Sequence, residues 1–135
     1  MTELTRAGDH WVLPVVGQSV FQLRLDYAVT LCLGNDVEVR IEEPFVLAAE
    51  GGQEWLVVPE GDAVQLAPVL GLNRSTVAWG AAFDDGRLEL SFVDGWRVSV
   101  TTSEDYEAWT VAGPHGLLIV SMPGGDLAVW HPDEP

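Results

Sequence analysis

The chain has 135 residues, with 21 acidic side chains against six arginines and no lysine, and a formal net charge of −15 at pH 7. A chain of this length fits one domain, residues 1–135 with an ordered core at about 11–131, and it can bury a core without disulfides or metal ions. A field of this sign repels phosphate backbones and anionic lipids, so we expect neither nucleic acid nor membrane as a partner.

The single cysteine, Cys32, has no second thiol with which to form an intrachain disulfide, and this favours a reducing compartment. The first residues lack the basic start and apolar stretch of a signal peptide, and no apolar run is long enough to span a bilayer. We therefore expect a cytoplasmic protein.

Apolar and polar residues alternate with period two along most of the chain, which predicts β-strands. The first predicted strand covers residues 19–26. A hairpin of strands 27–33 and 37–41 follows it, with its turn at residues 34–36. The inward residues of these three strands are expected to be Phe21, Leu23, Leu25, Tyr27, Val29, Leu31, Leu33, Val37, Val39 and Ile41.

Pro44 interrupts this ladder before two further apolar runs, 45–49 and 55–58. One short helix is predicted in the 61–71 region. It begins with Asp62 as its cap and is limited by Pro68, beyond which a kinked turn would continue it.

The second half of the chain returns to the strand pattern. One strand has Val77, Trp79, Ala81 and Phe83 as its inward residues, and the clearest hairpin, 86–100, follows with its turn at Asp94-Gly95. Three short strands near 106–111, 117–122 and 127–130 close the chain. The remaining predicted core residues are Leu88, Leu90, Phe92, Trp96, Val98, Trp109 and Leu118.

The hairpins at 27–41 and 86–100 superpose with a constant offset, which hints at an internal duplication. Only Leu31 with Leu90 and Val39 with Val98 are identical in this alignment. Two unrelated amphipathic hairpins would give a similar pattern, so both interpretations stay open at this point.

These elements predict an α+β fold that is mostly antiparallel β. We expect a strongly twisted sheet or a barrel-like roll, with one short helix packed against it.

No pattern in the sequence points to a catalytic or metal centre. The three histidines, His10, His115 and His131, lie far apart and form no ligand spacing, and Cys32 is expected to be a buried thiol on a strand. No G-x-S-x-G elbow occurs. We therefore expect no catalytic residue, no metal ligand and no cofactor, and we favour a domain that is not an enzyme.

The densest unusual segment is Glu104–Trp109, where two aromatic residues are interleaved with three carboxylates at the entry to a strand. Aromatic side chains supply a large contact area at low entropy cost, and flanking acids select a basic partner. A second interpretation places Trp109 in the core and Tyr106 with the acids at its rim. The candidate binding residues are Asp105, Tyr106, Glu107, Trp109, Asp26 and Tyr27.

Several segments also resemble known proteins: 105–109 and 123–130, with their D-Y-E-A-W and P-G-G-x-L-A-V-W motifs, then 113–116, 24–31 and 41–45. Through these segments the chain resembles a family of small uncharacterised bacterial proteins, a domain of unknown function common in actinobacteria. The resemblance implies a bacterial cytosolic setting and brings no catalytic residues with it.

We expect a non-catalytic protein-interaction module whose acidic face binds a basic protein, and an immunity-type antagonist of a basic toxin would be one such module. The alternative is a small-ligand or metal-ion binding domain, or a small hydrolase, whose pocket combines carboxylates and tyrosines from Asp26, Tyr27, Asp105, Tyr106 and Glu107. Exposed strand edges would also allow a homodimer.

Overall fold

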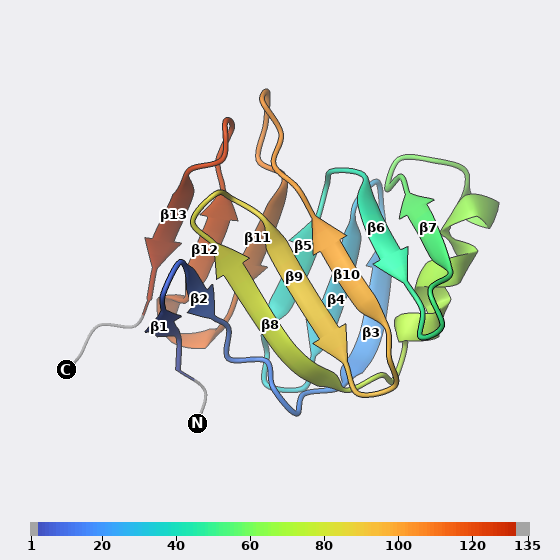
Figure 1. Cartoon of the computed structure of the whole chain (residues 1–135), viewed down its shortest axis with the longest axis horizontal. Coiled ribbons are helices and arrows are strands. Elements are labelled where there is room, and N and C mark those ends of the chain that lie inside the picture. The colour runs from blue at the N-terminus through green and yellow to red at the C-terminus, as the bar shows by residue number, and fades with distance from the viewer. Residues whose placement is uncertain (1–2, 132–135) are drawn as a thin grey trace.

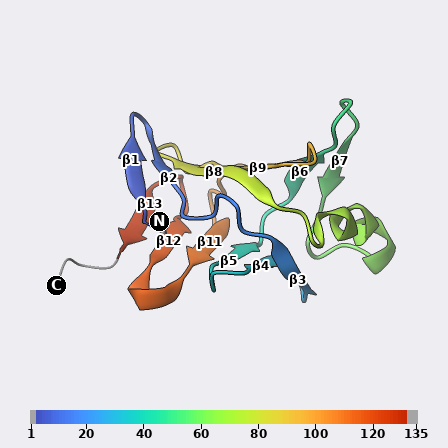
Figure 2. The same cartoon turned by 90° about the horizontal axis from the view of Figure 1, so that it is seen from below.

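The computed structural model describes residues 3–131, in which two antiparallel sheets face one another and a short helix lies at one open side between them (Figures 1 and 2). The predicted fold class, mostly antiparallel β with one short helix, is confirmed, and the two sheets do not close into a barrel. The ends of the predicted domain, residues 1–2 and 132–135, lie outside the described residues.

The first sheet has the strand order β1-β2-β8-β9-β10-β6-β7 and the second has the order β13-β12-β11-β5-β4-β3. The strands of the first sheet are β1 (Thr5–Ala7), β2 (His10–Val12), β8 (Val77–Phe83), β9 (Leu88–Phe92), β10 (Arg97–Val100), β6 (Phe45–Ala48) and β7 (Glu54–Val57). Those of the second are β13 (Leu127–Trp130), β12 (Leu118–Ser121), β11 (Trp109–Ala112), β5 (Glu38–Ile41), β4 (Val29–Leu33) and β3 (Val20–Leu25).

The predicted helix is present as the 3-10 helix η1 (Ala63–Leu72), which runs past Pro68, and a second 3-10 turn, η2 (Pro114–Gly116), precedes β12. The buried residues of η1, Leu66, Val69 and Leu72, are spaced by three, which is the period of a 3-10 helix rather than of an α-helix. Asp62 occupies the predicted cap position but makes no side-chain cap hydrogen bond. No helix within residues 3–131 is long and apolar enough to cross a membrane.

The core consists of inward residues of both sheets, as the alternation predicted. The fully or almost fully buried set includes Val29, Leu31, Leu33, Val37, Val39, Ile41, Leu88, Leu90, Phe92, Val98 and Trp109, together with the predicted buried thiol Cys32. Leu23 and Trp96 are partly buried and pack against this core.

Outside β8, four residues that were predicted to be buried are not. Phe21, Leu25 and Tyr27 are 64%, 42% and 81% exposed, and Leu118 is only half-buried because Leu117 and Ile119 take the inward positions around it. The register of β3 against β4 shifts between Val20 and Gln22, so Val20 points inward while Phe21 bulges out. Tyr27 stands in the turn after this edge strand with a positive φ of 75°.

A second bulge corrects the prediction for β8. Its register against β9 shifts between Val77 and Trp79, so the residues that follow change faces. Gly80 takes an inward position, where an added Cβ would lie 2.8 Å from side-chain atoms of Leu90 and Val15. Trp79 and Phe83, both predicted to face inward, instead pack on the outer face against the His10 ring, with their centroids 5.8 and 5.1 Å from its centroid.

The two halves of the chain repeat one arrangement of five strands (Figure 1). β3, β4 and β5 form a meander in the second sheet before the hairpin β6–β7 crosses to the first sheet. β8, β9 and β10 form a meander in the first sheet before β11–β12 crosses to the second. Each crossing hairpin pairs with the last strand of the other half's meander, β6 with β10 and β11 with β5.

The irregularities of the two halves also match. Both β3 and β8 carry a bulge at the same place, after Val20 and after Val77. The Val20 N–H donates to the Ser75 carbonyl and the Val77 N–H donates to the Gln18 carbonyl, each at 2.9 Å, and the side-chain oxygens of Ser19 and Thr76 meet at 2.8 Å between them. This reciprocal pairing is that of two copies related by an approximate two-fold axis. Of the two interpretations of the sequence, it supports the internal duplication.

Candidate functional site

Seven segments that connect strands lie at one end of the molecule, the upper end in Figure 1. They lie together because segments 42–44 and 101–108, through which the chain crosses from one sheet to the other, join equivalent ends of the two sheets. We call this the acidic end. It carries twelve of the 21 acidic residues: Asp9, Asp26, Glu42, Glu43, Glu60, Asp62, Asp84, Asp85, Glu104, Asp105, Glu107 and Asp126. Within residues 3–131, the loops of the opposite end carry only Asp36, Glu50 and Asp94, so the charge of the described loops is strongly asymmetric.

Arginines neutralise only part of the acidic end. Arg6 donates to both carboxylate oxygens of Asp84 from the two terminal nitrogens of its guanidinium, with the Nη1 hydrogen bond at 2.7 Å. Arg87 lies 3.0 Å from Asp85, and Arg40 contacts Asp26 and Glu42 at 3.5 and 3.2 Å. Seven carboxylates of this end make no ion pair within the described residues, namely those of Glu43, Glu60, Asp62, Glu104, Asp105, Glu107 and Asp126.

The Arg6–Asp84 pair also favours the ionised form of the Asp84 carboxyl group. The hydrogen bonds from the Arg6 guanidinium hold the pKa of the Asp84 carboxyl below its ordinary value, and the charge of Arg6 acts in the same direction. Asp84 therefore stays ionised, and the pair ties β1 to the turn between β8 and β9.

The structure places five of the six candidate binding residues on the acidic end. Asp26 and Tyr27 form the turn between β3 and β4, and residues 105–107 lie in the segment 101–108 between β10 and β11. Ser103 shapes this segment, because its buried hydroxyl accepts the N–H groups of Asp105 and Tyr106 at 3.2 and 3.3 Å. Tyr106 is left 64% exposed at the surface.

Trp109, the sixth candidate, is fully buried at the start of β11. Its indole Nε1–H donates to the carbonyl of Gly86 at 2.8 Å, and the Ser121 hydroxyl donates to the same carbonyl at 3.0 Å. Trp109 thus packs in the core and supports the acidic end from below, as the second interpretation of this segment stated, and its ring reaches no surface.

The two groups of candidate residues stay separate. No hydrogen bond or ion pair in the described part of the chain joins Asp26 or Tyr27 to residues 105–107. Residues 3–131 also contain no group of three or more histidine, cysteine, aspartate or glutamate side chains that could hold a metal ion. Of these five residues, Asp26 and Tyr27 line the hollow described next.

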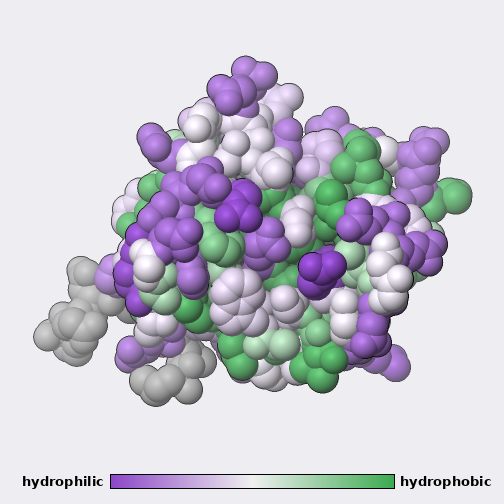
Figure 3. All heavy atoms as spheres, in the orientation of Figure 1, coloured by the Kyte–Doolittle hydropathy of each residue, from purple (hydrophilic) through white to green (hydrophobic). Residues whose placement is uncertain are grey.

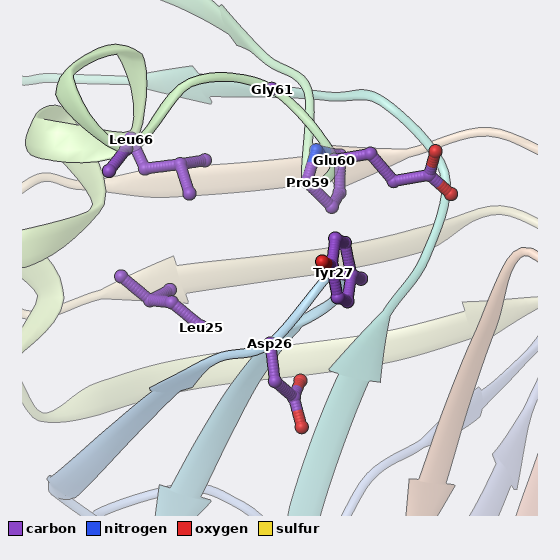
Figure 4. Close-up of a pocket in the computed structure, with 8 residues that line it drawn as sticks. Leu25, Asp26, Tyr27, Pro59, Glu60, Gly61 and Leu66 are labelled. Carbon is purple, nitrogen blue, oxygen red and sulfur yellow. The ribbon is translucent and has the colours of Figure 1, made fainter.

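A shallow hollow of about 340 Å³ adjoins the first of these groups (Figure 4). It lies between the β3–β4 turn, residues 25–27, and the segment that leads from β7 into η1, residues 59–66. In Figure 4 the side chains of Leu25 and Leu66 lie across from one another, Tyr27 stands beneath Pro59, and the carboxylate of Glu60 points outward.

The hollow lies where the acidic end meets an apolar edge of the molecule. This apolar edge is formed by exposed hydrophobic side chains on or next to β3, β7 and η1: Phe21, Leu25, Leu56, Val58, Val64 and Leu70. Figure 3, in the orientation of Figure 1, shows hydrophilic groups at the top of the molecule and hydrophobic patches toward its right side, where β7 and η1 lie. Adjacent exposed apolar side chains of this kind are typical of interaction surfaces.

Sequence reasoning found Asp26 and Tyr27 but missed the other wall of the hollow. A signal for it was present, because Pro59, Gly61 and Asp62 recur 64 positions later as Pro123, Gly125 and Asp126, a P-x-G-D repeat. This offset exceeds the hairpin offset of 59 by five, because segment 101–108 is five residues longer than segment 42–44. This repeat extends the alignment of the two halves beyond their hairpins.

The chain belongs to a family of unknown function, DUF6188, whose model matches residues 11–131. This match confirms the resemblance to a family without an assigned function. No curated protein and no solved structure matches the chain.

Proposed function

We propose, starting from membership of a family with no assigned activity, that this chain is a protein-interaction domain whose acidic end docks against a basic protein. The observation that supports the proposal is the distribution of charge over the described loops, with twelve acidic residues in the loops at one end and three in the loops at the other. Seven of the twelve have no ion partner within residues 3–131, so a partner's arginines and lysines gain attraction without displacing an internal pair.

Exposed aromatic residues at the same end suit this role. Tyr106 is held at the surface by the Ser103 turn, and Tyr27 is held there by the β3–β4 turn. Tyrosine combines an apolar ring with a polar tip and loses little entropy on binding, so it is frequent among residues that anchor interfaces.

The same negative field opposes association with nucleic acid and with anionic membranes. We place the interaction in a bacterial cytoplasm, where the free, buried Cys32 stays reduced. One form of such a module is an immunity-type antagonist, in which the acidic end covers a basic toxin. A toxin-like reading frame beside the gene would support that form over other basic partners.

Two charge-matched variants test the proposal as baits in a lysate of the native host. The acidic-end variant carries Glu43→Gln, Glu104→Gln, Asp105→Asn and Glu107→Gln, and none of these four side chains makes an ion pair within the described residues. The far-end variant carries Glu3→Gln, Asp36→Asn, Glu50→Gln and Glu54→Gln, which removes the same amount of charge elsewhere.

The wild-type and far-end baits should retain the same basic protein, and the acidic-end bait should lose it. Circular dichroism of all three proteins checks that the variants fold alike. Recovery of no basic protein by the wild type, or equal recovery by both variants, would contradict the proposal.

A further inference from the structure

The internal duplication gives the hollow a counterpart in the second half of the chain. The two P-x-G-D segments close with an equivalent hydrogen bond, which the Gly61 N–H donates to the Val58 carbonyl and the Gly125 N–H donates to the Met122 carbonyl, both at 2.9 Å, although only the second segment has positive φ values, 87° at Gly124 and 107° at Gly125. Each segment follows the second strand of a crossing hairpin, β7 or β12. Gly125 therefore marks the place in the second half that Gly61 holds beside the hollow.

In the second half this place is occupied by the protein's own chain. The turn between β8 and β9 packs directly on Gly125, since a Cβ added to Gly86 would lie 2.5 Å from the Gly125 carbonyl oxygen. The Gly86 carbonyl is then held from below by Trp109 and Ser121. The P-x-G-D turn of this half thus provides a surface on which another turn of the chain packs.

In the first half the equivalent turn is two residues shorter. The closing bond of the β8–β9 turn runs from the Phe83 N–H to the Arg87 carbonyl, whereas that of the β3–β4 turn runs from the Asp26 N–H to the Ala28 carbonyl. Tyr27 alone stands where the second half has residues 84–86. The hollow beside Gly61 is the space that the missing two residues leave open.

We propose that this hollow receives a turn of the basic partner, with an arginine side chain lying over Leu25 and Tyr27 and its guanidinium at Glu60. The inference rests on the proposed function, because it names the contact by which the acidic end selects its partner. In the first half, the counterparts of Trp109 and Ser121 are Phe45 and Val57, whose side chains cannot donate a hydrogen bond. The hollow therefore favours apolar methylene groups over a carbonyl group.

Arginine fits the lining better than lysine does. Its guanidinium is weakly hydrated, stacks on aromatic rings and pairs with carboxylates, while its stem covers apolar surface. Tyr27 offers an 81% exposed ring, Leu25 is 42% exposed, and Glu60 makes no ion pair within the described residues. The adjoining apolar edge would contact the residues that flank the arginine.

The test is an amide NMR titration of the full chain with two blocked tripeptides, acetyl-Gly-Arg-Gly-amide and the same peptide with citrulline, the neutral isostere of arginine. The arginine peptide should shift the resonances of Tyr27, Gly61 and Leu66 in a saturable way. The citrulline peptide should bind there several-fold more weakly, because it keeps the shape and loses the charge.

Tyr27→Asn removes the ring while keeping a residue that tolerates positive φ. It should weaken binding of the arginine peptide, measured at these resonances, roughly fivefold. Glu60→Gln should abolish the preference for arginine over citrulline. The matched control is Trp130→Thr, which removes an exposed aromatic ring from β13, outside the hollow and the acidic end, and should leave the titration unchanged.

Shifts confined to residues 101–108, or shifts at the hollow that Tyr27→Asn and Glu60→Gln leave unaltered, would overturn this inference while leaving the proposed function standing. Equal binding of both peptides would overturn it as well. Conversely, arginine-selective binding in the hollow, combined with equal recovery of a basic protein by the two charge variants, would show that the hollow is real and that the wider acidic end is not the docking surface.

Discussion

At the scale of single residues, Gly86 joins the two sheets at the acidic end. Its φ of 95° lies in the left-handed region, and an added Cβ would lie 2.3 Å from the Thr102 side chain and 2.5 Å from the Gly125 carbonyl oxygen. Its own carbonyl accepts hydrogen bonds from Trp109 and Ser121. Both the backbone conformation and the close approach therefore require glycine here.

Gly86→Ala should lower the free energy of unfolding by roughly 2–4 kcal/mol, through backbone strain and the clash with Gly125 combined. The control is Gly124→Ala in the neighbouring turn, where φ is also positive at 87° but nothing lies within 4 Å of an added Cβ. It should cost only about 1 kcal/mol, for the backbone term alone. Urea denaturation of both variants measures the difference, and equal losses would show that the packing of Gly86 on Gly125 contributes nothing.

The burial of individual residues was predictable wherever the strands were regular. The β9–β10 hairpin has no bulge, and its predicted inward residues Leu88, Leu90 and Val98 are fully buried. Phe21 was misplaced because it is the bulged residue between Val20 and Gln22, and a bulge is decided by pairing with a neighbouring strand rather than by local alternation.

At the scale of elements, β1 was missed because residues 1–11 carry no clear period, and the reason is visible in the structure. All three residues of β1 are exposed, so the strand contributes nothing to the core that a pattern could reveal. Outside its pairing with β2, it is held by the Arg6–Asp84 pair and by the Arg6 guanidinium, which lies 5.2 Å from the centre of the Trp11 ring.

Asp84→Asn should release β1, which amide hydrogen exchange of Arg6 and Ala7 would detect as faster exchange at neutral pH. Because the pKa of Asp84 is lower in the folded protein, the pair stabilises the folded state fully above the ordinary carboxyl pKa of about 3.9. That contribution is lost as the pH falls through the lower folded pKa. Wild-type β1 should therefore loosen in acid as the variant does at neutral pH.

Asp126→Asn is the control for this experiment, since Asp126 lies at the same end and makes no ion pair within residues 3–131. It should leave the exchange of β1 unchanged. Unaltered exchange of Arg6 and Ala7 in Asp84→Asn would instead mean that the β1–β2 ladder alone holds the strand.

At the scale of the whole molecule, composition predicted the excess of negative charge but not where it gathers. The position of the acidic residues depends on which strand ends lie at the same end of the two-sheet sandwich. That arrangement depends on the exchange of hairpins between the sheets. The constant offset between the two hairpins hinted at the duplication. The alternation of apolar and polar residues within a hairpin, however, does not indicate which sheet the hairpin joins. The hollow was unpredictable for the same reason, because its two walls meet only through this exchange.

The most direct test of the central claim, that the acidic end is the docking surface, is the affinity of the captured basic protein measured by calorimetry at low and high salt. For the acidic-end variant we expect about tenfold weaker binding at low salt, with a difference that shrinks as salt screens the charges. The far-end variant should bind as the wild type does at both salt concentrations. Equal weakening by the two variants, or affinities that do not respond to salt, would contradict the claim.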